Sequence, residues 1–418
     1  MTQGGRMQAK QIEQLIEAGQ PQFGVFSQVK RLNYLDYRSH LLSQKPVAKW
    51  RKQLKANQFA FIQLLQPPYR ICLALATIKL ATTAFAYIYN EESGQFEVVE
   101  ALQPLLRHSH FSGDHQQGEM RFEHADLSLQ MQFSQQSIQL ILDSQLFAVN
   151  ASCQRSRQPL AVCSPSGRRG WSFTQKEPLQ ITEGELTFKA DSKHFESVAS
   201  SASISADKPL PVNRSRIKFD SQARANLDWT LGFMRHETNW FWSCINSQLS
   251  DGRQFMLNLS MGVNETGVNE NACWIDGQIY YLPPVLFKRP PIDKNYRSMI
   301  KSVTKKVVRR QAVKQNEAQQ QAAYNHNNSH NSSDRDLQHL TDWHISNQDL
   351  GWSKVRVDFR FTPLKVYKKT DNYGVVASVF EQWIGLYSGK VYIQTQTGEE
   401  AVQLDRVMGL AEDHFAKW

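Results

Sequence analysis

Residues 251–277 read DGRQFMLNLSMGVNETGVNENACWIDG, and this stretch decides the fold. An Asp-Gly pair stands at each end of it, Asp251-Gly252 and Asp276-Gly277, next to alternating apolar and polar residues. Asp-Gly between such runs is a strong hairpin signal, because a type I′ turn needs positive φ at both central residues. The stretch therefore predicts antiparallel β-sheet, with both Asp-Gly pairs at hairpin tips.

The loop inside this stretch repeats Gly-Val-Asn-Glu and gathers carboxylates and amides. Two residues would be enough to close a hairpin, so a longer polar loop suggests a binding site. Asn and Gly also tolerate left-handed backbone, which leaves a structural loop as the alternative. A functional role needs Glu265 or Glu270 to line a cavity, where loss of hydration raises a carboxyl pKa and permits proton donation. These two residues are the candidate catalytic groups.

A chain of 418 residues is long enough for two domains. Strand patterns form one block over residues 23–190 and another over residues 217–418, with a Ser-rich linker at 191–216. Two blocks of comparable short strands predict a mainly β protein with two antiparallel β-barrels in tandem, because closure removes exposed sheet edges. Residues 1–22 are expected to be a helical or disordered extension, and residues 404–418 a short helix.

The chain shows no membrane or export signal. The N-terminus lacks an apolar core and a small-residue cleavage site, so we expect a cytoplasmic protein. Residues 71–89 are apolar enough to resemble a span, but Lys79 lies at their centre and β-forming residues dominate, which favours two buried strands. The five cysteines are odd in number and scattered, and they predict buried reduced thiols.

The net charge of +9 comes from one segment. Residues 288–314 contain ten Lys or Arg and a single acid, Asp293, so the rest of the chain sums to zero. The insertion at 290–340 is expected to hold a basic helix at 296–324, followed by a polar, disordered run at 325–336. A weak contact with a polyanion or anionic lipid would use Lys301, Lys305, Lys306, Arg309 and Arg310.

Motifs of several enzyme classes are missing from the sequence. There is no G-x-S-x-G, G-x-G-x-x-G or H-E-x-x-H, which argues against hydrolase, dinucleotide and zinc-protease chemistry. Four clustered histidines, His108, His110, His115 and His124, lack further ligands at metal spacing and are interpreted as polar loop residues. We therefore expect no metal and no cofactor. Residues 385–390, GLYSGK, miss a P-loop and predict a hairpin turn.

Strand alternation places Trp240 and Trp242 on one face, which requires either a core or a ligand cavity. Asn258, inside the next strand, must be hydrogen-bonded if it is buried. The candidate ligand-binding residues are Glu237, Asn239, Trp240, Trp242, Asn258, Asn264, Glu265, Asn269, Glu270 and Asn271.

Several segments resemble a known bacterial family, the domain of unknown function 2804. They are GWSFTQKEPL (170–179), LDWTLGFMRHETNWFWS (227–243), the Asn-Glu-rich loop, LPPVLF (282–287) and FEQWIGLYSG (380–389). That family is distantly similar to calycin-like proteins of the carotenoid hydratase and tocopherol cyclase type, which have two lipocalin-like barrels. The resemblance implies a double barrel with a cavity for an apolar ligand, and it transfers no catalytic residue. The insertion at 290–340 departs from the family pattern.

The leading hypothesis is a double β-barrel that binds a hydrophobic or amphipathic small molecule, such as a lipid or isoprenoid, in a cavity of the second barrel. One alternative is a hydratase-, cyclase- or isomerase-like enzyme in which Glu265 or Glu270 protonates an alkene or carbonyl. Another is an adaptor that meets nucleic acid or a membrane surface through the basic insertion. The sequence leaves open whether any reaction is catalysed.

Overall fold

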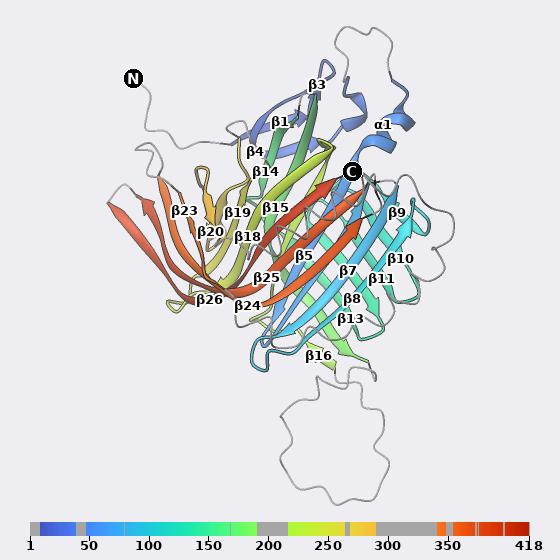
Figure 1. Cartoon of the computed structure of the whole chain (residues 1–418). Coiled ribbons are helices and arrows are strands. Elements are labelled where there is room, and N and C mark those ends of the chain that lie inside the picture. The colour runs from blue at the N-terminus through green and yellow to red at the C-terminus, as the bar shows by residue number, and fades with distance from the viewer. Residues whose placement is uncertain are drawn as a thin grey trace, which may run out of the picture. The chain divides into compact units, whose positions relative to one another are not determined.

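The computed structural model describes residues 9–38, 47–78, 80–167, 169–189, 216–263, 268–289, 341–347, 354–372, 374, 376–395 and 398–417. Contacts between Cα atoms divide the chain into two compact units. Unit 1 comprises Met1–His236 and Cys244–Pro284, and unit 2 comprises Glu237–Ser243 and Val285–Trp418. Figure 1 labels the elements along the chain.

The larger sheet has 15 strands and lies in unit 1. Its main path runs β8-β7-β6-β5-β17-β15-β13-β12-β11-β10-β9, and β14 and β16 pair with β15. The neighbours are antiparallel apart from β1, which pairs parallel with β4. The strands are β1 (Lys10–Gln14), β4 (Gly24–Arg31), β5 (Asn57–Gln66), β6 (Tyr69–Thr77), β7 (Ala81–Asn90), β8 (Phe96–Pro104), β9 (Ser109–Phe111), β10 (Gly118–Glu123), β11 (Leu127–Phe133), β12 (Ser137–Ser144), β13 (Phe147–Arg155), β14 (Leu160–Ser166), β15 (Gly170–Phe188), β16 (Arg216–Lys218) and β17 (Arg224–Phe233).

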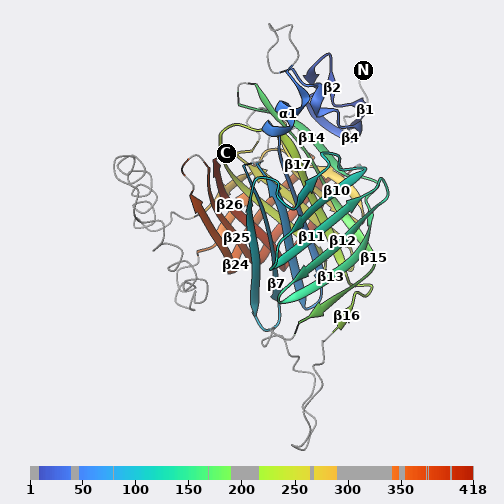
Figure 2. The same cartoon turned by 90° about the vertical axis from the view of Figure 1, so that its right-hand side faces the viewer.

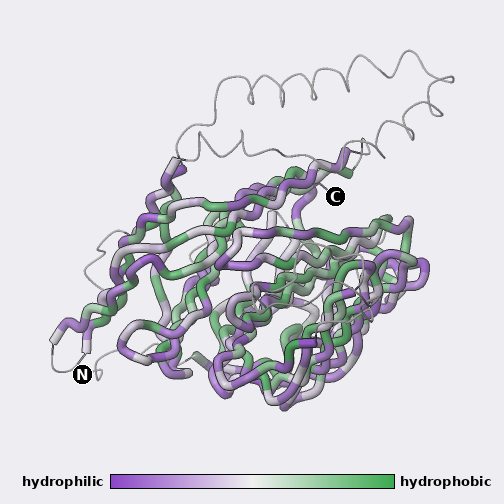
Figure 3. The backbone as a smooth tube through the Cα atoms, turned by 90° about the horizontal axis from the view of Figure 1, so that it is seen from below, coloured by the Kyte–Doolittle hydropathy of each residue, from purple (hydrophilic) through white to green (hydrophobic). Residues whose placement is uncertain are grey.

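This sheet curls around a hydrophobic core, as Figure 2 shows for β7, β10 to β13 and β15. Successive side chains of a strand point to opposite faces, so every second residue reaches the core. In β11 the buried residues alternate with half-buried or exposed ones along the whole strand, as the sequence predicts. Figure 3 shows hydrophobic stretches distributed along the strands.

The second sheet has nine strands in the order β21-β20-β19-β18-β26-β25-β24-β23-β22. Strand β18 passes from unit 2 into unit 1 between Ser243 and Cys244. The strands are β18 (Glu237–Gln248), β19 (Gln254–Met261), β20 (Ala272–Ile275), β21 (Gln278–Tyr281), β22 (Leu286–Lys288), β23 (Trp343–Ser346), β24 (Val355–Asn372), β25 (Ala377–Gln394) and β26 (Glu399–Lys417). The predicted fold class, a mainly β protein with two antiparallel β-barrels in tandem, is confirmed in the form of two curled, largely antiparallel sheets.

Other elements are few in the described part of the chain. A two-stranded ribbon joins β2 (Ile16–Glu17) to β3 (Gln20–Pro21), and the helices are η1 (Tyr34–Asp36) and α1 (Lys49–Lys55). None of the described helices is long and apolar enough to cross a membrane. The stretch 71–89 resembles a span in sequence, and its residues 71–77 and 81–89 lie in the paired strands β6 and β7, as predicted.

Both Asp-Gly pairs lie at hairpin tips, which confirms the prediction. Asp276 and Gly277 join β20 to β21 with φ values of 49° and 80°, the backbone that a type I′ turn requires. The turn between β18 and β19 is longer, and there only Gly252, at φ 89°, has positive φ. The prediction of buried reduced thiols is also confirmed, because all five cysteines are free and buried.

Two helical predictions are wrong. Residues 404–418 carry good helix formers, yet residues up to Lys417 belong to β26, which pairs with β25 along almost its full length. Residues 10–14 form β1, which pairs with β4 and buries Ile12. In both segments the pairing with a neighbouring strand outweighs local helix propensity.

The predicted hairpin turn at residues 385–390 is also wrong, because β25 runs through it with strands on both sides. A Cβ atom on Gly385 would lie 2.4 Å from the carbonyl oxygen of Thr362 on β24. The glycine therefore permits close strand packing instead of a turn. The predicted basic helix at 296–324, the polar run at 325–336 and the linker at 191–215 lie outside the described residues.

Candidate functional site

The predicted polar loop follows β19, and the part of it that the structure describes is well ordered by hydrogen bonds. Asn258 Nδ2 donates to the Glu270 carbonyl oxygen over 2.6 Å. Asn271 Oδ1 accepts from the Ser260 backbone N–H at 2.7 Å, and Asn271 Nδ2 donates to the Pro283 carbonyl oxygen at 3.1 Å. Asn269 Oδ1 accepts from the backbone N–H of Asn271. Three of the predicted amides, at 258, 269 and 271, thus shape the loop that presents Glu270. Asn264 and Glu265 lie outside the described residues.

Glu270 is buried, and its carboxylate meets a buried lysine. Glu270 Oε2 lies 3.3 Å from Nζ of Lys176, which is also ion-paired with Asp228. Burial lowers the pKa of Lys176, but the charges and hydrogen bonds of Asp228 and Glu270 outweigh it and leave that pKa above its ordinary value. The lysine is therefore a buried cation between two carboxylates.

The register of the strands explains how this group forms. Lys176 on β15 stands directly opposite Asp228 on β17, and Asn226 stands opposite Gln63 on β5. All four point away from the hydrophobic core of unit 1, which takes the alternate residues such as Trp229. Arg70 on β6 lies diagonally from Gln63 on the same face. We call the buried side chains Gln63, Arg70, Lys176, Asn226, Asp228 and Glu270 the polar cluster.

Two donors of the polar cluster lack a hydrogen-bond partner among the residues that the structure describes. Arg70, only 1% exposed, binds Glu91 through Nε at 2.9 Å and Nη2 at 2.7 Å, but its Nη1 has no hydrogen-bond partner in the described part of the chain. Gln63, with no exposed surface, accepts weakly from the Cys244 thiol, while its Nε2 has no partner. Buried donors without partners are rare in native proteins, which makes this face of β5 and β6 a candidate binding place. Other buried side-chain nitrogens without partners among the described residues are in Gln58, His115, Trp171, Trp229 and Trp383.

The cysteines beside the polar cluster are not reactive. Cys244 accepts a hydrogen bond from Asn226 Nδ2 at 3.4 Å. Burial raises the pKa of Cys244 well above its usual range, and Arg70 and Lys176 lower it only slightly. Burial likewise raises the pKa of Cys72 to about 12. Since the thiolate is the nucleophilic form, both cysteines act as small packing residues.

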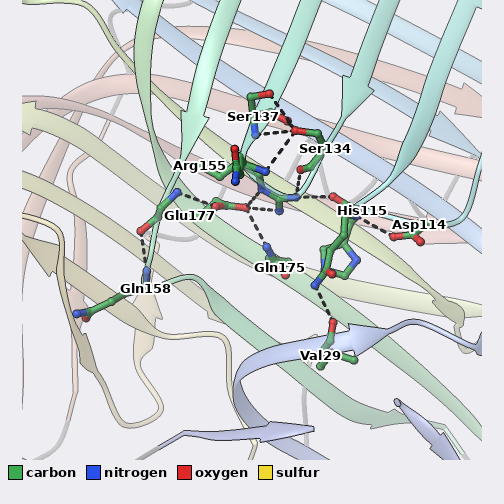
Figure 4. Close-up of polar contacts among 12 residues, drawn as sticks. Val29, Asp114, His115, Ser134, Ser137, Arg155, Gln158, Gln175 and Glu177 are labelled. Carbon is green, nitrogen blue, oxygen red and sulfur yellow. Dashed lines mark hydrogen bonds and ion pairs between the residues drawn. The ribbon is translucent and has the colours of Figure 1, made fainter. Parts of the chain in front are cut away.

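A second buried polar group lies on the opposite, core-facing side of β15. Figure 4 shows the Arg155 guanidinium held between Glu177 and backbone carbonyl groups. Arg155 Nε donates to Glu177 Oε1 at 3.0 Å, and Nη1 donates to the carbonyl oxygens of His115 and Ser134 at 2.6 and 3.1 Å. Gln175 Nε2 also donates to Glu177, at 2.9 Å. Each nitrogen of the Arg155 guanidinium thus has a hydrogen-bond partner, which indicates a structural role for this ion pair.

His115 beside this ion pair lies in the loop between β9 and β10, as predicted, but it is only 1% exposed. Its ring centroid lies 5.1 Å from that of Trp229 and 5.2 Å from that of Phe173, and neither ring nitrogen has a partner in hydrogen-bonding geometry. Burial, and then the charge of Arg155, lower the pKa of His115 to about 3, with Gln175 opposing the shift. His115 is therefore neutral near pH 7.

The predicted residues of strand β18 that precede Ser243 belong to unit 2. Glu237 is exposed and lies 3.3 Å from Lys417, and Asn239 is exposed as well. Trp242 is buried, and Trp240 donates from Nε1 to Glu412 over 3.1 Å. These side chains are thus not all part of one site.

Unit 2 has an aromatic face with its own charged group. The Arg289 guanidinium lies 5.1 Å from the ring centroid of Trp343 and 5.3 Å from that of Trp383. It forms ion pairs of 2.7 Å with Glu381 and 2.6 Å with Asp413. Burial raises the pKa of Asp413 despite Arg289. The rings contact one another, with Trp343 and Trp383 centroids 6.4 Å apart, as expected for a packed core.

A pocket of about 510 Å³ in unit 1 lies between the end of β8 and β10 and is lined by residues such as Leu102, Arg107, His108 and Glu123. It contains none of the predicted site residues. In the part of the chain that the structure describes, no group of three or more His, Cys, Asp or Glu could hold a metal ion.

Glu270 is a candidate from the sequence, whereas its ion-pair partner Lys176 is not among the predicted residues. The signal was present in Gln175-Lys176-Glu177, three consecutive polar residues that are all buried inside a strand. In a strand with one solvent-exposed face, polar and apolar residues alternate. Three consecutive polar residues between apolar neighbours therefore indicate polar side chains on both faces of the strand.

Among solved structures, the chain is similar to CghA in complex with Sch210972, with a TM-score of 0.46, 9% identity, and coverage of 87% of this chain and 89% of that chain. It is similar to kievitone hydratase from Nectria haematococca, with a TM-score of 0.42, 10% identity, and coverage of 85% and 88%. No curated protein matches it by sequence. The model of the domain of unknown function DUF2804 matches residues 13–418, so the chain belongs to this family, as its motifs predict.

Proposed function

We propose that the protein binds a small, mainly apolar molecule with a neutral oxygen acceptor, such as a carbonyl or hydroxyl group, at the polar cluster of unit 1. One observation carries the proposal: Arg70 Nη1 and Gln63 Nε2 are buried donors without partners. A buried donor without a partner costs about 1 to 3 kcal/mol. A ligand that places an acceptor oxygen beside these donors removes this cost. A ligand without such an oxygen leaves the donors unpaired and should bind less tightly.

The charges around the polar cluster favour a neutral ligand. The cations Arg70 and Lys176 are matched by three carboxylates, on Glu91, Asp228 and Glu270. An anionic ligand would add a further negative charge to a group in which carboxylates already outnumber cations. A carbonyl or hydroxyl oxygen accepts hydrogen bonds without adding charge.

The neighbouring side chains favour an apolar ligand body. Phe61, Ala74 and Tyr87 are buried and lie on the same face of their strands as Gln63 and Arg70. Ligand sites commonly combine such apolar walls with a small number of polar groups that fix orientation. A lipid or isoprenoid alcohol or ketone meets both requirements.

The ion pairs favour binding over catalysis by Glu270. Glu270 Oε2 lies 3.3 Å from the Lys176 ammonium, so this carboxylate is already engaged in an ion pair within the protein. Because the pKa of Lys176 is raised, the lysine stays protonated and is a poor nucleophile for a carbonyl group. Whether Glu265 takes part stays a prediction, since it lies outside the described residues.

The proposal moves the ligand from the second barrel, where the sequence suggested it, to unit 1. The reason is that the predicted Trp240 is hydrogen-bonded to Glu412, whereas Gln63 and Arg70 place two donors without partners among the described residues on one face of neighbouring strands. In unit 2 the described residues leave a single such donor, Nε1 of Trp383. Lipid or isoprenoid binding remains the expected function, at a different place in the fold.

Native mass spectrometry of the full-length protein, followed by solvent extraction, tests the proposal. We expect a co-purified neutral molecule, or, if the protein is isolated empty, a rise in melting temperature with farnesol and none with laurate. A protein that retains no neutral molecule and gains no stability from farnesol would contradict the proposal.

A further inference from the structure

Helix α1 (Lys49–Lys55) has no buried residue. Trp50 and Leu54 are 57% and 55% exposed, and Val47, just before the helix, is 37% exposed. Trp50 and Leu54 are four residues apart, so they project from the same side of the helix. The chain thus presents a tryptophan and a leucine side by side to solvent.

Local bonds are the main support that the described residues give this helix. Lys52 donates from Nζ to the Leu35 carbonyl oxygen, and the Ala48 carbonyl accepts from the backbone N–H groups of Arg51 and Lys52. Isolated helices shorter than about 12 residues are marginal in water and normally depend on packing of an apolar face. An apolar face that none of the described residues buries is suited to an external surface.

The basic residues of α1 indicate that the external surface is negatively charged. Lys49, Arg51, Lys52 and Lys55 lie in or at the end of the helix, and the sequence contains no Asp or Glu between Asp36 and Glu91. The Arg51 guanidinium lies 5.1 Å from the Trp50 ring centroid, so charge and aromatic surface are combined in one place. A helix with basic side chains around an exposed Trp and Leu is typical of segments that lie in the headgroup region of a bilayer.

We propose that α1 docks unit 1 on an anionic lipid surface, with Trp50 and Leu54 entering the headgroup region and the basic residues meeting lipid phosphates and carboxylates. Charge complementarity identifies this occupant, because each Lys or Arg near an anionic leaflet strengthens binding. Trp is enriched at such interfaces because its ring is apolar while its N–H stays hydrated. This inference does not depend on the ligand proposed for the polar cluster.

Vesicle flotation with the full-length protein tests the inference. Vesicles of phosphatidylcholine alone are compared with vesicles in which about one quarter of the lipid is phosphatidylserine. We expect binding to the anionic vesicles only, and a loss of binding as salt is raised. Equal binding to both vesicles, or binding to neither at low salt, would overturn the proposal.

Two variants separate the apolar and charged contributions. Lys49→Gln, Arg51→Gln and Lys55→Gln together should weaken binding about 100-fold at low salt, given the contribution of each basic residue near such a surface. Trp50→Ser with Leu54→Ser should weaken it at least about tenfold, through lost apolar burial. Lys52 is left unchanged because it holds the helix. Neither variant should shift the melting temperature, since α1 buries no residue.

Matched controls keep the result specific. Leu80→Ser with Leu105→Ser removes two leucines that are 61% and 55% exposed elsewhere on unit 1, and binding should not change. Lys301→Gln with Lys305→Gln and Lys306→Gln removes basic residues of the insertion. If these insertion changes abolish binding while the α1 variants bind normally, the docking surface is not α1 and the proposal is wrong.

Discussion

Lys176 Nζ on the central strand β15 lies 3.3 Å from Oε2 of Glu270, in the loop after β19. Both side chains are buried, and Lys176 also pairs with Asp228. A buried charge stays buried only when it is paired, so this contact ties the loop to the strand. The loop that first suggested a site is therefore anchored by the motif GWSFTQKEPL.

Replacing Glu270 with Gln tests this anchoring role. The amide keeps the size of the side chain but leaves Lys176 with Asp228 as its remaining ion-pair partner, so we expect a loss of about 1 to 3 kcal/mol in the free energy of unfolding. Urea denaturation measures it. Glu237→Gln is the control, because Glu237 is exposed and should give no measurable change. Unchanged stability of the Glu270 variant would show that the ion pair does not anchor the loop.

Acid should destabilise the protein through His115. In the unfolded chain the histidine gains a proton below its ordinary pKa of 6.5, whereas in the folded protein its pKa is lowered to about 3. The unfolded state therefore binds more protons, and stability present above pH 6.5 is lost as pH falls toward 3. His115→Phe should flatten the decline in melting temperature over this range. His124 is exposed, so the melting temperature of His124→Phe should fall with pH as that of the wild type does.

The backbone at Gly252 gives a test of the hairpin. Its φ of 89° is unfavourable for a β-branched residue, and a Cβ there would meet no atom within 4 Å, so strain is the sole expected effect. Gly252→Val should lower the free energy of unfolding by about 1 to 3 kcal/mol. Gly252→Asn should lower it less, because Asn tolerates left-handed backbone. Equal losses for both variants would contradict the assignment of the effect to φ.

The insertion at 290–340 should be removable. Lys288 on β22 pairs with His344 on β23, so the two ends of the segment meet at one hairpin. Replacing residues 290–340 with a short Gly-Ser linker, while Arg289 is retained, should leave the far-UV circular dichroism and melting temperature unchanged. Any binding of nucleic acid at low salt should disappear, since the segment carries the basic excess. Loss of folding would show that the segment is structural.

The fold was predictable because its signals are local. Alternating residues at 127–133 and the Asp-Gly pairs specify strands and turns within a few residues of themselves. The C-terminal segment was misread because helix propensity is also local, while pairing with β25 is not.

The site was only partly predictable for a related reason. The position of Glu270 in a polar loop suggested function, but its partner Lys176 comes from a distant strand, and spacing in sequence does not reveal that register. The unpartnered donors of Gln63 and Arg70 depend on every neighbouring atom, so only the folded structure identifies them.

The most direct test of the ligand proposal is a comparison of Gln63→Met with Gln58→Met. Both glutamines are on β5, are buried and have an Nε2 without a partner, but Gln58 lies on the opposite face of the strand. We predict that Gln63→Met weakens binding of the co-purified ligand, or of farnesol, about tenfold in isothermal titration, as expected for one lost hydrogen bond. Gln58→Met should bind as the wild type does. Unchanged affinity in Gln63→Met, or an equal loss in Gln58→Met, would contradict the account.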